Sequence, residues 1–125
     1  MKEKIRIEYI MNNVSMGILW NSISTVGGLS GWFADRVSTD DKTYTFEWGK
    51  SQQQAELVNM RVGYYIRFHW CDDEPKTYFE LKITPDELTG DVALTVTDYA
   101  PADEKDDLIE LWNKQIKELK RKYGI

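Results

Sequence analysis

The hydrophobic pattern of this chain changes its period at Pro101, and that change limits the folds open to it. Before Pro101, successive segments alternate apolar and polar residues, as strands with one dry face do. After it, apolar residues recur every three or four positions, which is the spacing of one stripe on a helix. A sheet with one dry face and a helix with one dry stripe bury these surfaces against each other. The pattern therefore predicts an α+β fold.

Seven segments are strand-like, and six of them follow one another directly. The turns between these six are short enough for hairpins and contain Asp, Gly or Pro, so an antiparallel meander is the economical arrangement. The segments are residues 4–10, 34–39, 42–48, 52–62, 64–70, 77–84 and 91–99, and the turns are Asp40-Asp41, Gly49-Lys50, Gly63, 72–76 and 85–90. We expect the first segment to join the other six in one sheet.

One face of this sheet is predicted to be apolar. In four segments the apolar residues share one parity, while neighbours such as Arg67, His69 and Lys82 are polar. The apolar positions are Tyr44, Phe46, Trp48, Ile66, Phe68, Trp70, Phe79, Leu81, Ile83, Val92, Leu94 and Val96. The sheet therefore has a dry face and a wet face.

Two regions have helical spacing. Ser15 is suited to cap a short helix that carries Ile18, Leu19, Trp20 and Ile23, and we expect Gly27-Gly28 to end that helix before a second short turn over 29–33. After Pro101, acidic residues begin a longer helix and basic residues end it, which matches the helix dipole. Its stripe is Leu108, Leu111, Trp112, Gln115, Ile116 and Leu119. Only the dry face of the sheet is large enough to receive this stripe.

Charge and cysteine content exclude several classes of partner. The net charge of -5, from 16 Lys and Arg against 21 Asp and Glu, disfavours nucleic acid and anionic lipid. The N-terminal residues lack the long apolar stretch of a signal peptide or membrane span, so we expect no membrane insertion. The single Cys71 cannot form an internal disulfide, which makes a reducing cytoplasm the default location. His69 and Cys71 are two potential ligands where structural zinc needs four, so neither a metal nor another cofactor is expected.

The order of elements resembles the START-like, or helix-grip, superfamily, which is also called SRPBCC. The motifs that carry the resemblance are Leu19-Trp20, the GLSGWF stretch at 28–33, YYIRFHW at 64–70 and VALTVTDYA at 92–100. They are most similar to domains like the ATPase activator of the ninety-kilodalton heat-shock chaperone. The usual Pro before the first helix is replaced by Asn12-Asn13-Val14-Ser15, so Ser15 must supply the cap. The resemblance implies a single domain over 1–125, in which a curved seven-stranded antiparallel sheet wraps a long C-terminal helix, with two short helices between strands 1 and 2.

The resemblance also implies where a ligand would bind, because members of this superfamily commonly have an apolar cavity between the sheet and the long helix. In this sequence the wall of that cavity would be Trp20, Trp32, Phe46, Trp48, Leu57, Phe68, Leu81, Leu94, Leu111, Trp112 and Gln115. The alternative is that these large rings fill the space, since protein cores pack to a density of about 0.75. Gln115 lies in an otherwise apolar stripe, so its amide needs a partner from a ligand, the backbone, water or partial exposure.

Three functions remain open at this point. The first is a non-enzymatic domain that binds a small hydrophobic molecule, lipid-like or aromatic, in that cavity. The second is a protein-interaction or chaperone-regulator domain with a filled core, for which a homodimer is one arrangement. The third is a cyclase-like enzyme, which requires a buried carboxylate, His or Tyr with a shifted pKa facing the cavity. Tyr9, Tyr44, Tyr64 and Asp98 are the residues that could reach the mouth of the cavity, and no catalytic pair follows from their spacing.

Overall fold

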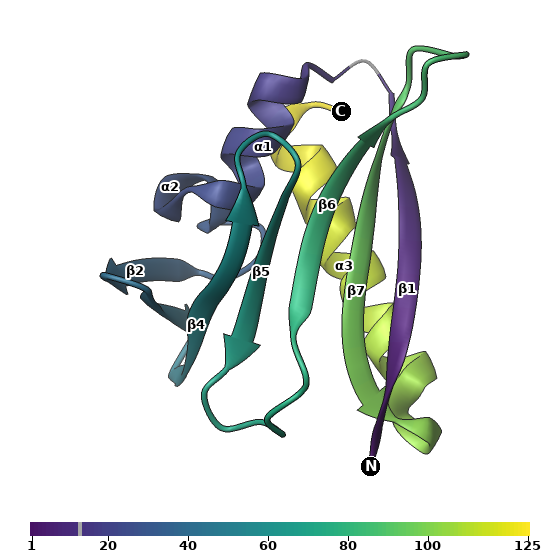
Figure 1. Cartoon of the computed structure of the whole chain (residues 1–125). Helices are drawn as coiled ribbons and strands as arrows, with labels where there is room; N and C mark the ends of the chain where they lie inside the picture. The colour runs from purple at the N-terminus through teal and green to yellow at the C-terminus, as the bar shows by residue number, and fades with distance from the viewer. Residues whose placement is uncertain (13) are drawn as a thin grey trace.

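The computed structural model describes residues 1–12 and 14–125 of the chain. A seven-stranded sheet is packed against one long helix, with two short helices beside it (Figure 1). The elements are β1 (Lys2–Met11), α1 (Met16–Ser24), α2 (Val26–Leu29), β2 (Arg36–Asp40), β3 (Thr43–Trp48), β4 (Ser51–Arg61), β5 (Tyr65–Trp70), β6 (Phe79–Pro85), β7 (Val92–Pro101), a 3-10 turn (Ala102–Glu104) and α3 (Lys105–Tyr123). The predicted fold class and element order are confirmed.

The sheet has the order β1-β7-β6-β5-β4-β3-β2, with every neighbouring pair antiparallel. The six consecutive strands form the predicted meander, and β1 joins it beside β7. This placement puts the first and last strands together, so the chain enters the sheet next to the strand that leads into α3. The helix α3 crosses the dry face, and β1 and β2 lie at opposite edges of the sheet (Figure 1).

The strand β4 has an irregularity that simple alternation does not predict. Its register against β5 shifts between Leu57 and Asn59, so that Met60, rather than Asn59, lies opposite the buried Ile66. A bulge of this kind adds one residue to a strand and bends it. The side chain of Val58, at the shift, and that of Met60, beyond it, are exposed. The predicted strand is present, but its second half does not continue the dry parity of its first half.

The glycine pair does not end the first helix as predicted. The helix α1 ends at Ser24, and Gly27 and Gly28 lie inside α2. Thr25 separates the two helices, because its hydroxyl donates to Asn21 O at 2.9 Å and accepts the amide of Gly28 at 2.8 Å. The same side chain thus closes one helix and caps the next. The predicted cap at Ser15 is confirmed, since its Oγ accepts the amide of Ile18 at 3.1 Å.

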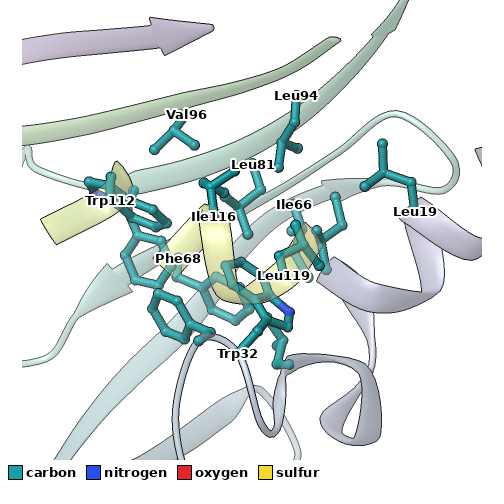
Figure 2. Close-up of a cluster of buried hydrophobic side chains, with 14 of the residues drawn as sticks. Leu19, Trp32, Ile66, Phe68, Leu81, Leu94, Val96, Trp112, Ile116 and Leu119 are labelled. Atoms are coloured by element: carbon teal, nitrogen blue, oxygen red, sulfur yellow. The ribbon is translucent and has the colours of Figure 1, made fainter. Parts of the chain in front are cut away.

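The core lies between the dry face of the sheet and the inner faces of α1 and α3. Figure 2 shows Ile116 and Leu119 of α3 directed toward Phe68 and Leu81 of the sheet. These side chains are at most 2% exposed, as are Leu19, Ile66, Leu94 and Val96. Ile18, which shares the helical spacing of α1, is 52% exposed and takes no part in the core. The apolar parity predicted for β3, β5, β6 and β7 is therefore the parity that faces α3.

Candidate functional site

A pocket opens between the sheet and the first half of α3. Its volume is about 380 Å³, which lies within the range of small-molecule sites. The lining comes from the turn after α2, from the ends of β3 and β5, from β4 and β7, and from α3. The lining residues are Phe33, Trp48, Gln53, Trp70, Asp98, Leu108, Leu111, Trp112 and Gln115. Most of this surface is apolar, with three polar side chains among the rings.

The aromatic walls follow from the period of the strands. Trp48 and Trp70 are the last residues of β3 and β5, both on the parity that faces α3, and their ring centroids are 6.2 Å apart. Phe33 comes from the turn after α2 and stacks on Trp70 at 6.4 Å and on Trp112 of α3 at 5.7 Å. Stacked and tilted arrangements at these separations are favourable for aromatic pairs. Three separate parts of the chain thus meet in one wall.

A single backbone oxygen connects two sides of the pocket. The carbonyl of Phe33 accepts a hydrogen bond from Trp48 Nε1 at 2.8 Å and another from Gln115 Nε2 at 3.1 Å. Of the partners that the sequence left open for the Gln115 amide, the structure therefore gives the backbone. Since one oxygen holds both donors, the distance between β3 and α3 is fixed at this point.

Asp98 is the buried titratable group of the pocket. It follows Val92, Leu94 and Val96 on the dry parity of β7, and it is 9% exposed. Its Oδ2 accepts from Trp112 Nε1 at 2.9 Å, and its Oδ1 accepts from the amide of Tyr99 at 2.7 Å. Burial raises the pKa of the carboxyl to about 6, although both hydrogen bonds act to lower it. The carboxyl group is therefore protonated below about pH 6 and ionised above it.

Asp98→Asn is expected to change how stability depends on pH. The pKa of Asp98 is about 6 in the folded chain and near 3.8 when it is unperturbed, so between these values the folded state holds a proton that the unfolded state has lost. Raising the pH through this window therefore lowers the free energy of unfolding of the wild type, by on the order of 3 kcal/mol in total. Through space, Lys2 opposes the raised pKa and Asp73 adds to it.

Urea denaturation of both proteins at pH 4, 5, 6 and 7.5 measures this effect. The stability of Asp98→Asn relative to wild type should increase up to pH 6 and then level off. The control is Asp40→Asn, because Asp40 is an exposed residue at the end of β2. A difference between Asp98→Asn and wild type that is independent of pH would contradict the prediction.

The residues expected to form the site are divided between the pocket and the core. Trp48, Leu111, Trp112 and Gln115 line the pocket. The others lie deeper or to the side: Trp32, Phe46, Phe68, Leu81 and Leu94 are buried in the core, and Trp20 and Leu57 are half-buried against it. Phe33, Gln53, Trp70 and Leu108 line the pocket without having been expected there. Trp70 shares its parity and its strand-end position with Trp48, and that signal could have found it.

The other residues singled out in the sequence lie outside the pocket. His69 Nδ1 is 2.8 Å from the carbonyl oxygen of Thr77, on the wet face, and Cys71 is exposed. Tyr9 donates to Asn113 Oδ1 at 2.7 Å, and burial raises the pKa of its hydroxyl to about 12. Tyr64 is 46% exposed in the turn between β4 and β5. Within residues 1–12 and 14–125, no helix is both long enough and apolar enough to cross a membrane.

A curved antiparallel sheet, a long C-terminal helix and an apolar pocket between them define a helix-grip protein. The chain belongs to the START-like superfamily, because the family model for the START-like superfamily domain matches residues 1–125. The resemblance recognised in the glycine and aromatic motifs is confirmed.

Solved structures of similar proteins agree with this assignment. BfR322 from Bacteroides fragilis, determined by solution NMR, is 53% identical, and the match covers 99% of this chain and 93% of that one with a TM-score of 0.70. The Aha1 dimer from Colwellia psychrerythraea is 13% identical, with 94% and 93% covered and a TM-score of 0.77. DynU16, from the dynemicin biosynthetic locus, is 17% identical with a TM-score of 0.81, and the match covers 97% of this chain and 47% of DynU16. The last two matches show the fold alone. A search of curated proteins found no match.

Proposed function

We propose that residues 1–125 form a single, non-enzymatic domain that binds a small hydrophobic molecule, either aromatic or lipid-like. The observation that carries this proposal is the pocket of about 380 Å³, whose walls are four aromatic rings and two leucines. This apolar surface is open to solvent. A small apolar ligand would cover it, and the removal of that surface from water would favour binding. We place this activity in the cytoplasm, in keeping with the single free Cys71.

The ligand would lie beside the first half of α3 only, where the pocket opens. Deeper between the helix and the sheet, Phe46, Phe68, Leu81 and Leu94 are fully buried in the core. Such side chains are close-packed and leave little room for a further molecule. The proposed site is therefore smaller than the whole space between sheet and helix, and it suits a compact ring system better than a long chain.

Native mass spectrometry of freshly purified protein tests the proposal. We expect a co-purifying small molecule, or an added apolar compound, to give a bound mass that denaturation releases. Leu111→Arg should abolish this mass, because Leu111 is 52% exposed at the mouth of the pocket and can accept a longer side chain without unfolding the domain. The matched control is Leu88→Arg, since Leu88 is 96% exposed in the turn between β6 and β7.

A mass that is free of ligand and unchanged by a panel of apolar compounds would contradict the proposal. It would favour the second candidate, an interaction domain that pairs with a copy of itself. The exposed apolar side chains of Val58, Met60 and Val62, in and after β4, favour this candidate, and the Colwellia psychrerythraea Aha1 protein is a dimer. The same spectra report it directly, as a dimer mass.

The cyclase-like enzyme remains a third prediction. Asp98 is a buried carboxyl group with a raised pKa that lines the pocket, which is the feature this hypothesis requires. Its two hydrogen-bond donors, Trp112 Nε1 and the amide of Tyr99, are not acid or base groups. We therefore assign Asp98 a role in binding.

A further inference from the structure

We propose that the ligand of this pocket is an aromatic amine, whose rings lie among the tryptophans and whose ammonium group lies against Asp98. This inference rests on the proposed function, because it names the class of molecule that the same pocket binds. Three features of the pocket carry it: the hydrogen bonding of Asp98, the aromatic walls and the available volume.

Asp98 brings an acidic group into the pocket without a direct cationic partner among the described residues. Lys2, the lysine that acts on it through space, makes its own ion pair with Asp73 at 2.8 Å. The two donors that do bond Asp98, an indole and a backbone amide, are neutral. An ionised carboxylate that is 9% exposed is costly unless a positive charge compensates it. A bound ammonium group would supply that charge.

The carboxylate also has acceptor capacity to spare. Ionised carboxylates have about four lone-pair sites, and the structure fills one on each oxygen of Asp98. Asp98 is part of the pocket lining, so a ligand donor in the pocket can approach the remaining sites. An ammonium group has several N–H donors and can satisfy both oxygens, which a single hydroxyl cannot do.

The aromatic rings around the pocket also favour a positively charged ligand. Trp48, Trp70 and Trp112 line it together with Phe33. The faces of aromatic rings carry partial negative charge and attract ammonium groups, most strongly for tryptophan. A carboxylate ligand would be repelled by Asp98 and by the face of any of these rings that it approached. The pocket should therefore bind a cationic ligand more tightly than an anionic ligand that has the same ring system.

The volume limits the size of the amine. About 380 Å³ lies near the lower end of the roughly 300–1,000 Å³ that small-molecule sites have. A fused two-ring body with a short amine side chain fits this space. The net charge of -5 also attracts cations toward the protein before they bind.

Three soluble probes that share an indole ring test the inference: tryptamine is a cation, tryptophol is neutral and indole-3-acetate is an anion. Their affinities are measured at pH 7.5 by calorimetry and by amide chemical shifts in NMR titrations. Tryptamine should bind about ten- to a hundredfold more tightly than tryptophol, because a hydrogen bond to a charged group contributes more than a neutral one. Indole-3-acetate should bind most weakly.

Asp98→Asn should bring the affinity for tryptamine down to that for tryptophol and leave tryptophol nearly unchanged. Asparagine keeps an acceptor for Trp112 Nε1, so the wall is retained while the charge is removed. The matched control Asp106→Asn, on the exposed first turn of α3, should leave both affinities unchanged. In the wild type, tryptamine should bind more weakly below about pH 6, where Asp98 gains a proton, while tryptophol should not.

The outcomes separate this inference from the function on which it rests. If tryptophol binds as tightly as tryptamine, or if Asp98→Asn weakens the two equally, the amine inference is overturned and the pocket still binds apolar rings. If no probe shifts the amide signals of the pocket residues, the proposed function fails as well. The pH dependence of the wild type decides the question even where Asp98→Asn does not fold.

Discussion

Gly28→Ala is expected to lower the free energy of unfolding by about 3 kcal/mol, whereas Gly27→Ala should leave it unchanged or raise it slightly. A Cβ atom on Gly28 would lie 2.0 Å from the carbonyl oxygen of Asn21 and 2.8 Å from Ser22 Cα, both of them backbone atoms of α1. Backbone cannot move aside as a side chain can, so the effect belongs at the upper end of what overpacking costs, about 1–3 kcal/mol. At Gly27 a Cβ would meet nothing within 4 Å.

Urea denaturation of the two variants beside the wild type measures this pair. Alanine at position 27 also reduces the freedom of the unfolded chain and favours the helix, which is the source of the expected gain of up to about 1 kcal/mol. Equal losses of stability in both variants would mean that the general need for glycine in α2, rather than the close approach of α1, determines the result. Wild-type stability in Gly28→Ala would contradict the packing of α2 on α1.

Phe33→Ala is expected to cost about 3–5 kcal/mol, the usual range for a large aromatic side chain removed from a core. Phe33 is 3% exposed, and its ring contacts the rings of Trp32, Trp48, Trp70 and Trp112 at centroid distances between 5.6 and 6.4 Å. Near-ultraviolet circular dichroism should therefore change strongly in the variant, since four of the five tryptophans lose a neighbour.

Phe33→Leu is the matched control for that substitution. Leucine keeps most of the apolar volume, and hydrophobic replacements of similar size usually cost less than about 1.5 kcal/mol. Urea denaturation of both variants separates the effect of losing the volume of the ring from the contribution of the backbone at position 33, which both variants keep. If alanine cost no more than leucine at position 33, Phe33 would not be the centre of the aromatic cluster.

The sheet and the long helix could be predicted because their signals are periodic and repeated. Alternation in β3, β5, β6 and β7 fixed the face that meets α3, and the charges at the two ends of α3 fixed its extent. The break between α1 and α2 was predicted at the wrong place for a local reason. Glycine is a strong general signal for the end of a helix, but the hydroxyl of Thr25 makes the bonds that end α1 and begin α2.

The site was harder to predict than the fold. A side chain that faces α3 can be buried in the core or can line the open pocket, and the sequence pattern does not distinguish the two. Phe46 and Trp48 share a strand and a parity, yet Phe46 is fully buried while Trp48 lines the pocket. The difference comes from tertiary packing rather than from spacing in the sequence, because the rings of Phe33, Phe68 and Trp70 surround Phe46. Phe33 lies in a turn, where no periodic pattern indicates which way a side chain points.

The carbonyl of Phe33, which receives the side chains of Trp48 and Gln115, has a consequence for how this protein could acquire new ligands. The spacing between β3 and α3 is set there by a main-chain atom, which every amino acid at position 33 would retain. Substitutions at Trp70, Leu108 or Leu111 can alter the chemistry of the walls and leave that spacing in place. Ligand preference can therefore change one residue at a time, while the spacing between β3 and α3 stays the same.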